Sequence, residues 1–238
     1  MRHIMLIDSE KCIDCRACIM ACQQKNSVPP GYSRNGVRKA FDSNSRSGAH
    51  FQPWACMHCE NPPCVRSCPT LATYKDVTGV VLIDGERCIG CGNCIDTCPY
   101  DARFRHPLTG IADKCDYCLS AGGEPACVAA CPVQCRYFGD ADDPKSHVSQ
   151  LLATRKIVHV APEGSFIQPT LAYLNSTLPS ALPAVSDKPD SGKKLGFLAE
   201  GLSWAGAGVL AALGGVWIRQ AVRPSTREEE KISQEEKK

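Results

Sequence analysis

Cys88-Ile-Gly-Cys-Gly-Asn-Cys-Ile-Asp-Thr-Cys-Pro99 is the stretch of sequence that decides the fold. Its spacing, C-x2-C-x2-C-x3-C-P, is typical of cysteines that bind [4Fe-4S] cubes. In such a run three thiolates wrap a loop around one cube, and the fourth departs on a helix toward a neighbouring cube. Residues 12–22 repeat the spacing, with Gln23 in place of the proline. The sequence therefore contains an internal repeat of a cluster-binding unit.

Outward from these two runs, four groups of four account for all but one of the seventeen cysteines. The second group widens its central gap to four residues and the fourth group widens it to eight, but both keep the terminal C-x3-C. Sixteen ligands predict four [4Fe-4S] clusters and no three-iron cluster. Cys135 is left over, and we expect a packed thiol there rather than a ligand. The groups are Cys12, Cys15, Cys18 and Cys22; Cys56, Cys59, Cys64 and Cys68; Cys88, Cys91, Cys94 and Cys98; and Cys115, Cys118, Cys127 and Cys131.

Zinc and disulfides are the alternative explanations for so many cysteines. C-x2-C pairs also hold structural zinc, but the triplets of the first and third groups would leave thiolates over in tetrahedral sites. Disulfide scaffolds are usually short secreted chains, whereas this chain has 238 residues and clusters its cysteines locally. Aromatic residues make up only 6% of the chain, so we expect the cubes to nucleate the fold around them.

The net charge of the chain and its N-terminal residues argue against a nucleic-acid-binding protein and against an export signal. A formal charge of +2 argues against a nucleic-acid partner. Residues 1–8 have no basic region followed by an apolar stretch and no twin arginine, so we expect no export signal there. Between the cysteines, His58 either packs in its loop or tunes a cluster by hydrogen bonding to sulfide. Lys75 and Lys114 are expected to be solvated, with stabilisation of a reduced, more negative cluster as the alternative.

Secondary structure is readable in a few places. Residues 73–75 and 80–84 predict a β-hairpin that turns at residues 76–79. Residues 156–160 predict one further strand. The segment 23–49, rich in Ser, Asn, Gly and Arg, predicts an inserted surface loop.

The C-terminal third predicts a membrane anchor. Residues 175–194 are rich in Pro, Ser, Ala and Asp and predict a linker. Residues 195–218 carry one acidic charge, Glu200, and predict a single transmembrane helix, with a buried hairpin helix of the soluble body as the alternative. Residues 219–238 predict a solvated charged tail. A stripe of small residues on the helix is suited to packing against a partner helix. The stripe consists of Ala207, Ala211 and Gly215.

Basic residues around this helix predict its orientation. Six follow it closely and three precede it, which favours a cytoplasmic tail and a periplasmic cluster domain, with the cytoplasmic face as the alternative. Trp204 and Trp217 near its two ends suit the membrane interfaces without choosing a direction. The basic residues are Arg219, Arg223, Arg227, Lys231, Lys237 and Lys238 after the helix, and Lys188, Lys193 and Lys194 before it.

With the four groups in place, the sequence resembles the iron-sulfur β subunits of the complex iron-sulfur molybdoenzyme family. That family includes dimethyl sulfoxide, polysulfide and tetrathionate reductases and membrane-bound formate dehydrogenase. The resemblance spans about residues 6–174, and residues 119–126 form a shorter loop than the family pattern. It rests on Cys56-Met-His-Cys-Glu-Asn-Pro-Pro-Cys64, Cys88-Ile-Gly-Cys-Gly-Asn-Cys94, Cys98-Pro-Tyr-Asp-Ala-Arg-Phe104, Ala112-Asp-Lys-Cys115, Pro125-Ala-Cys127, and Gly139-Asp140 with Asp143-Pro144.

The resemblance implies an α+β fold of two pseudo-symmetric ferredoxin-like modules. Residues 1–22 and 105–174 would form one module, and residues 50–104 the other. Carried over residue by residue, it also implies that the fourth cysteines cross over within each module. The implied ligands are Cys12, Cys15, Cys18 and Cys131 for cluster 1; Cys115, Cys118, Cys127 and Cys22 for cluster 2; Cys56, Cys59, Cys64 and Cys98 for cluster 3; and Cys88, Cys91, Cys94 and Cys68 for cluster 4.

The implied function is a relay of single electrons without catalysis in this chain. Its partners would be a large catalytic subunit with a molybdenum or tungsten pterin and an integral membrane subunit that exchanges electrons with quinone or haem. Both would belong to a respiratory complex of the bacterial inner membrane, and the catalytic partner would carry the twin-arginine export signal. The alternatives are the same relay in a membrane-bound hydrogenase or another quinone-linked complex, and a catalytic iron-sulfur enzyme, for which the sequence offers no acid-base set.

Overall fold

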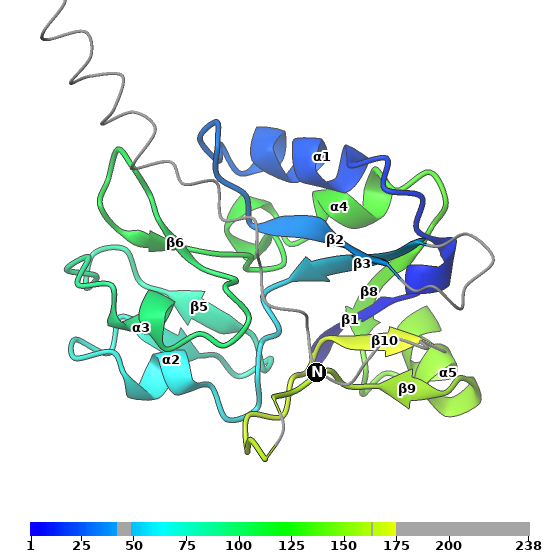
Figure 1. Cartoon of the computed structure of the whole chain (residues 1–238). Helices are drawn as coiled ribbons and strands as arrows, with labels where there is room; N and C mark the ends of the chain where they lie inside the picture. Colours follow the sequence, from blue (N-terminus) through cyan, green and yellow to red (C-terminus); the bar gives the residue numbers. More distant parts are fainter. Residues whose placement is uncertain (42–48, 163, 175–238) are drawn as a thin grey trace, which may run out of the picture. The chain divides into compact units, whose positions relative to one another are not determined.

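The protein folds as small β-sheets joined by loops and short helices (Figure 1). The cysteine groups lie in these connecting loops and helices. The structure is a computed structural model, and it describes residues 1–41, 49–162 and 164–174. Within these residues the largest sheet has four strands, in the order β8, β1, β10, β9. They are β1 (His3–Ile7), β8 (Arg136–Asp140), β9 (Ile157–Val158) and β10 (Ala172–Leu174).

Strand β1 lies inside this sheet and is strongly apolar. Met5, Leu6 and Ile7 are fully buried. The strand pairs antiparallel with β8 and parallel with β10, where Leu6 lies opposite Ala172. Helix α5 (His147–Thr154) packs on β8 and contributes Val148 to a core cluster with Leu6. The sheet therefore joins the N-terminus to the segments that follow the fourth cysteine group.

Two pairs of helices place the cysteine groups. Helix α1 (Ala17–Lys25), in the first group, packs against α4 (Ala126–Ala129), in the fourth. Helix α2 (Pro63–Arg66), in the second group, packs against α3 (Asn93–Asp96), in the third. Both pairs are visible in Figure 1. The 3-10 helix η1 (Ser9–Lys11) directly precedes the first group, and a second 3-10 helix, η2 (Leu119–Ala121), lies within the fourth. This arrangement matches the two-module fold that the resemblance implies.

The predicted hairpin is confirmed. Strand β4 (Thr73–Lys75) pairs antiparallel with β5 (Val81–Ile83). The carboxylate of Asp76 fixes the turn, because it accepts hydrogen bonds from the backbone N–H groups of Thr78, at 3.0 Å, and Val80, at 2.8 Å. Two further elements, β6 (Phe104–Arg105) and β7 (Ala112–Asp113), form a second short hairpin. The strand predicted at residues 156–160 is the two-residue β9.

The prediction of a surface loop at residues 23–49 is wrong over much of its length. Strand β2 (Asn35–Phe41) pairs antiparallel with β3 (Ala49–Ala55). The Trp54 indole lies over Gly36, where a Cβ would stand 2.6 Å from the indole nitrogen. Asn35 is buried and donates a hydrogen bond to the carbonyl of Cys18 at 3.1 Å. Polar composition hid the strand, since Gly and a hydrogen-bonded Asn stand where apolar side chains would be expected.

The predicted linker (175–194), transmembrane helix (195–218) and charged tail (219–238) lie outside the described residues. Among the residues that are described, no helix has the length and apolarity needed to span a bilayer.

Candidate metal centres

The four cysteine loops repeat one backbone turn. In every group the residue just before the second cysteine has a positive φ: Asp14 (52°), His58 (44°), Gly90 (67°) and Tyr117 (57°). Such backbone is costly for residues other than glycine and is typical of functional sites. At Gly90 a side chain is excluded outright, because a Cβ would stand 2.4 Å from the carbonyl oxygen of Gly110. The repeated turn gives each C-x2-C loop the same local course.

The structure brings together the predicted ligands of clusters 1 and 4. Each set of four cysteines lines a single small hollow. The fourth cysteines are held by backbone donors: the N–H of Thr73 lies 3.4 Å from Cys68 Sγ, and the N–H of Cys135 lies 3.3 Å from Cys131 Sγ. Hydrogen bonds to the sulfurs are one of the means by which proteins set cluster potentials.

The predicted ligands of clusters 2 and 3 also come together. The Asn26 amide donates to both Cys22 Sγ, at 3.6 Å, and Cys118 Sγ, at 3.4 Å. Burial raises the pKa of Cys22 to about 12, and negative charge on Cys127 and Cys118 contributes. In the other module, burial and then charge on Cys56, Cys64 and Cys98 raise the pKa of Cys59. A thiol whose pKa is raised in this way loses its proton when it binds metal. Cluster binding therefore releases protons.

The solvent exposure of the cysteines divides the four sets of predicted ligands into two pairs. Cys15 among the predicted ligands of cluster 1 and Cys91 among those of cluster 4 are exposed. The predicted ligands of cluster 2 are all buried, and those of cluster 3 are buried except for the half-buried Cys98. Clusters 1 and 4 would therefore lie at the surface and clusters 2 and 3 inside.

Three buried residues, His58, Lys114 and Tyr117, lie where the second and fourth cysteine groups come together. The rings of His58 and Tyr117 are in contact, and neither side chain is exposed. The ammonium of Lys114 donates to the carbonyls of Val81 and, at 2.7 Å, Cys115. Lys114 is only 2% exposed, so the expectation that it is solvated is wrong. Its carbonyl partners belong to different modules, and this explains its burial.

Two buried arginines are site residues that sequence reasoning missed. Arg103 is 5% exposed and donates to Cys64 Sγ at 3.0 Å. Arg136 is 2% exposed and lies 3.8 Å from Cys18 Sγ. A signal for them is present in the sequence, because each stands five residues after a fourth cysteine, in the pattern C-P-x-x-x-R.

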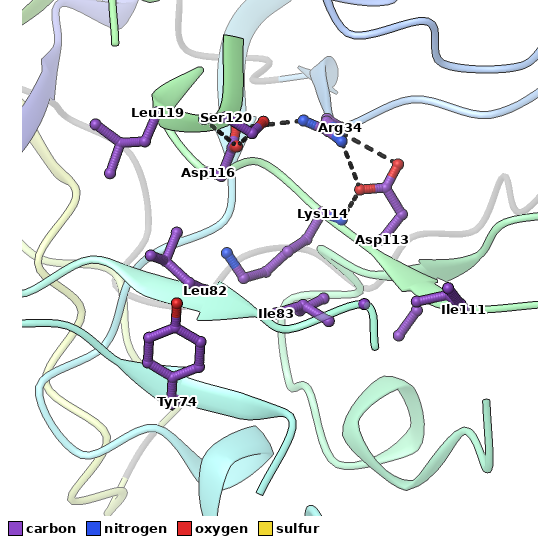
Figure 2. A pocket seen from close by; sticks show the side chains of 12 residues that line it. Arg34, Tyr74, Leu82, Ile83, Ile111, Asp113, Lys114, Asp116, Leu119 and Ser120 are labelled. Carbon is purple, nitrogen blue, oxygen red and sulfur yellow. Dashed lines mark hydrogen bonds and ion pairs between the residues drawn. The ribbon is translucent and has the colours of Figure 1, made fainter. Parts of the chain in front are cut away.

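Arg34 is a partly buried arginine that is paired with carboxylates. Figure 2 shows its guanidinium between Asp113 and Asp116, at the rim of a hollow that Tyr74, Leu82 and other side chains also line. The ion-pair distances are 2.9 Å to Asp113 and 3.2 Å to Asp116. Burial lowers the pKa of Arg34, but the two carboxylates raise it above its ordinary value.

Hydrogen-bond donors without partners lie around the thiols and indicate which kind of group the hollows bind. Several buried polar atoms there have no hydrogen-bond partner among the described residues, although buried donors in proteins normally have one. The sulfur atoms of a [4Fe-4S] cube accept hydrogen bonds, so a site lined by these donors fits such a cube. In the described part of the chain no set of three or more His, Cys, Asp or Glu residues is arranged for a single metal ion. The unpartnered atoms are Arg103 Nε, Arg136 Nε, His58 Nε2, Tyr100 Oη and Tyr117 Oη.

Cys135 is buried, and its thiol lies beside the predicted ligands of cluster 1. Its Sγ is 3.5 Å from Cys131 Sγ. A hydrogen bond between the Cys135 and Cys12 thiols lowers the pKa of Cys12 to about 6 and raises the pKa of Cys135. Cys135 is therefore a seventeenth thiol in direct contact with the predicted ligands of cluster 1.

Comparison with known proteins places the chain among iron-sulfur proteins. Two models, each of a 4Fe-4S dicluster domain, match residues 48–141 and 11–72. The thiosulfate reductase electron transfer subunit of Salmonella typhi is 46% identical over 149 residues, which cover 60% of this chain and 78% of that protein. The chain is a member of the family of iron-sulfur electron-transfer subunits of the complex iron-sulfur molybdoenzymes.

Other members of the family share the same region. One component of the polysulfide reductase of Wolinella succinogenes is 41% identical over 163 residues, 65% of this chain and 84% of the relative. One component of the tetrathionate reductase of Salmonella typhimurium is 39% identical over 182 residues, 73% of this chain and 72% of the relative. These matches confirm the predicted family, and with the seventeen cysteines they support [4Fe-4S] clusters as its cofactors.

Proposed function

We propose that this chain relays single electrons through four [4Fe-4S] clusters between a catalytic subunit and a membrane subunit of a respiratory complex. The observation that carries the proposal is the graded exposure of the sixteen cysteines. A relay needs its end clusters near the surface, where partners dock, and its inner clusters shielded from solvent. Clusters 1 and 4, with exposed Cys15 and Cys91, are the proposed ends.

Charges that act between cysteines of different clusters support the order 1, 2, 3, 4 along the relay. After burial, which is the main cause, charge on Cys18 of cluster 1 helps to raise the pKa of Cys127 of cluster 2. Charge on Cys56 of cluster 3 likewise helps to raise the pKa of Cys115 of cluster 2, after burial and Cys127. Arg103 is held between Cys64 of cluster 3 and, at longer range, Cys94 of cluster 4. Each cluster would thus have its successor as a neighbour.

The protein supplies ligands, insulation and docking faces, while each bound cube supplies the one-electron chemistry. We propose the sixteen cysteines as ligands in the four sets given above, with Cys135 as a bystander. Ile13 and Ile89 occupy equivalent positions after the first cysteine of their groups and are 58% and 68% exposed. Each lies at one proposed end, so each suits the core of a contact with a partner subunit.

The partner at one end is proposed to be a large molybdenum or tungsten pterin subunit, and at the other a quinone- or haem-linked membrane subunit. The relatives named above support this, since each is part of a reductase of a sulfur compound. A hydrogenase or another quinone-linked complex is the alternative. The chain itself is proposed to be non-catalytic.

Membrane attachment is a further part of the proposal. Residues 195–218 would anchor the chain in the bacterial inner membrane, and their flanking charges support a periplasmic cluster domain with a cytoplasmic tail. The cytoplasmic face is the alternative orientation.

Purification of the intact complex tests the proposal. Detergent-solubilised membranes would be fractionated anaerobically on a tag carried by this chain, and the co-purifying subunits identified. We expect one pterin-containing large subunit and one integral membrane subunit, together with electron flow from reduced quinone or haem to the catalytic substrate, or the reverse. A hydrogenase large subunit would establish the alternative complex. Turnover that persists in a complex lacking this chain would refute the relay.

A further inference from the structure

The guanidinium groups of Arg103 and Arg136 are charges without a carboxylate. Within the described residues neither forms an ion pair with Asp or Glu, although Arg34 forms two. Burying an unpaired charge is expensive, so buried charges are normally paired. Something anionic must therefore stand beside each of these two arginines in the assembled protein.

The anion beside Arg103 is a set of thiolates. Its Nη2 lies 3.0 Å from Cys64 Sγ and its Nη1 lies 3.4 Å from Thr73 Oγ1, while Nε has no partner among the described residues. Burial lowers the pKa of Arg103, but charge on cysteines, led by Cys64 and Cys56, raises it above its ordinary value. The predicted ligands of cluster 3 thus include its closest anionic neighbours.

Arg136 lies near predicted ligands of two clusters. Burial lowers its pKa, but charge on Cys127 of cluster 2 and then on Cys18 of cluster 1 raises it above its ordinary value. Its sulfur contact with a predicted ligand is with cluster 1. It is buried, and its contacts are long: 3.8 Å to Cys18 Sγ and to Met5 Sδ, and 3.5 Å to the carbonyls of Gly36 and Trp54. Its Nε also lacks a partner among the described residues. A fully buried guanidinium with only long contacts is poised for a stronger acceptor than the protein alone provides.

The repeat explains why there are two such residues. In each module one fourth cysteine is followed by C-P-x-x-x-R, at Cys98 and Cys131. The equivalent position after Cys68 is Thr73, whose N–H bonds Cys68 Sγ, and near Cys22 the donor is the neutral amide of Asn26. A fixed positive charge therefore accompanies every second cluster of the proposed relay.

We infer that Arg103 and Arg136 are the counter-cations of clusters 3 and 1 and raise the reduction potentials of those two cubes. Reduction adds one negative charge to a cube, and a buried cation close to a ligand sulfur stabilises that charge in a low-dielectric surrounding. Hydrogen bonds to cluster sulfur also act on the potential. Both arginines are positioning and tuning residues, and the inference rests on the proposed function, since it requires clusters in these sites.

The test is a redox titration of the anaerobically purified complex, followed by paramagnetic resonance. Arg103→Met and Arg136→Met remove the charge at similar length, whereas Arg103→Lys and Arg136→Lys keep it. We expect each Met variant to lower the equilibrium constant for reduction of one cube at least tenfold, which is about 59 mV for one electron. The two Met variants should shift different signals, and the Lys variants should shift them less.

Arg66→Met and Arg16→Met are the matched controls. Arg66 is exposed and lies two residues from Cys64, the cysteine that Arg103 contacts. Arg16 is exposed and lies two residues from Cys18, the cysteine that Arg136 contacts. Solvent screens their charges, so we expect little shift. Equal shifts in the controls would overturn the inference, as would unchanged potentials in both Met variants.

Loss of a cube is also decisive. If Arg103→Met loses about four irons while Arg103→Lys retains them, the site needs the charge, which supports the inference. If the Met and Lys variants lose the cube alike, the arginine serves packing, and the inference fails. A wild-type complex without cubes would instead overturn the proposed function itself, so the two failures are distinguishable.

Discussion

The imidazole ring of His58 lies against the phenol ring of Tyr117, with ring centroids 4.0 Å apart and planes inclined by 35°. Each residue stands just before the second cysteine of its group, His58 in the second group and Tyr117 in the fourth. The two cluster-binding modules therefore touch through equivalent positions of their repeats. This contact lies between residues proposed to hold clusters 2 and 3, where it fills space that water would otherwise enter.

Replacing Tyr117 by alanine is expected to destabilise the protein more than any exposed aromatic replacement. Loss of a fully buried ring typically costs roughly 3–5 kcal/mol through the cavity it leaves. The midpoint of guanidinium-induced loss of visible cluster absorption, measured anaerobically, should fall markedly. Tyr74→Ala is the control, because Tyr74 is 40% exposed. Equal sensitivity of the two variants would contradict this account of the junction.

Cys22→Ser should damage the cube held by Cys115, Cys118 and Cys127, because the Cys22 thiol lies among those thiols and shares the Asn26 amide with Cys118. Paramagnetic resonance of the variant reports which signal is lost. The cube held by Cys12, Cys15 and Cys18 should keep its spectrum. If that cube is the one that disappears, the crossover of fourth cysteines is incorrect.

Iron content separates Cys131 from its neighbour Cys135. We expect about sixteen irons per chain in the wild type and negligible zinc. Cys135→Ala should leave this value unchanged, since Cys135 lies outside the four groups of four, whereas Cys131→Ala should remove about four irons. Metal analysis of anaerobically purified protein is the measurement. Iron loss in Cys135→Ala that matches the loss in Cys131→Ala would make Cys135 a ligand.

Gly90→Ala should prevent assembly of cluster 4. The position has a φ of +67°, and a Cβ would meet the Gly110 carbonyl oxygen at 2.4 Å, so the loop between Cys88 and Cys91 must shift. Gly110→Ala is a matched control, with a φ of +71° and nothing within 4 Å of the added atom. We expect loss of about four irons in the first variant and full iron content in the second.

Membrane attachment predicts two fractionation results. Alkaline carbonate should leave the full-length protein in the membrane and release a version that ends at residue 186, because only the former contains residues 195–218. Protease added to intact spheroplasts should digest the cluster domain and spare the tail. Removal of the last residues alone would reverse the orientation, and carbonate release of the full-length protein would argue against the anchor.

Cysteine spacing was the strongest guide to this protein because cluster ligands must stand at set intervals, which leaves the pattern legible in the sequence. The hairpin at β4 and β5 was predictable from the turn between its strands, whereas the two-module arrangement was implied only by the family resemblance. Strand β2 was not predictable, because Gly36 and Asn35 are explained only by Trp54 and the Cys18 carbonyl, which the linear pattern does not reveal.

The charged residues of the site were harder to predict than its ligands. Lys114, Arg103 and Arg136 are residue types that are solvated by default, and their burial depends on partners distant in sequence. Lys114 finds the Val81 carbonyl, 33 positions away, and Arg103 finds the Cys64 sulfur, 39 positions away. The repeated C-P-x-x-x-R pattern was the one available signal for the arginines.

The exposure of Cys15 and Cys91 also has a consequence for the protein outside its complex. Access to the cysteines governs oxidation of their sulfur, and oxidants reach an open site before an enclosed one. In the chain without its partners the two proposed end cubes would be open and the two inner cubes enclosed, so damage in air would begin at both ends and move inward. The subunits that receive and deliver electrons would therefore also serve as shields, and early association with them would protect the newly made protein.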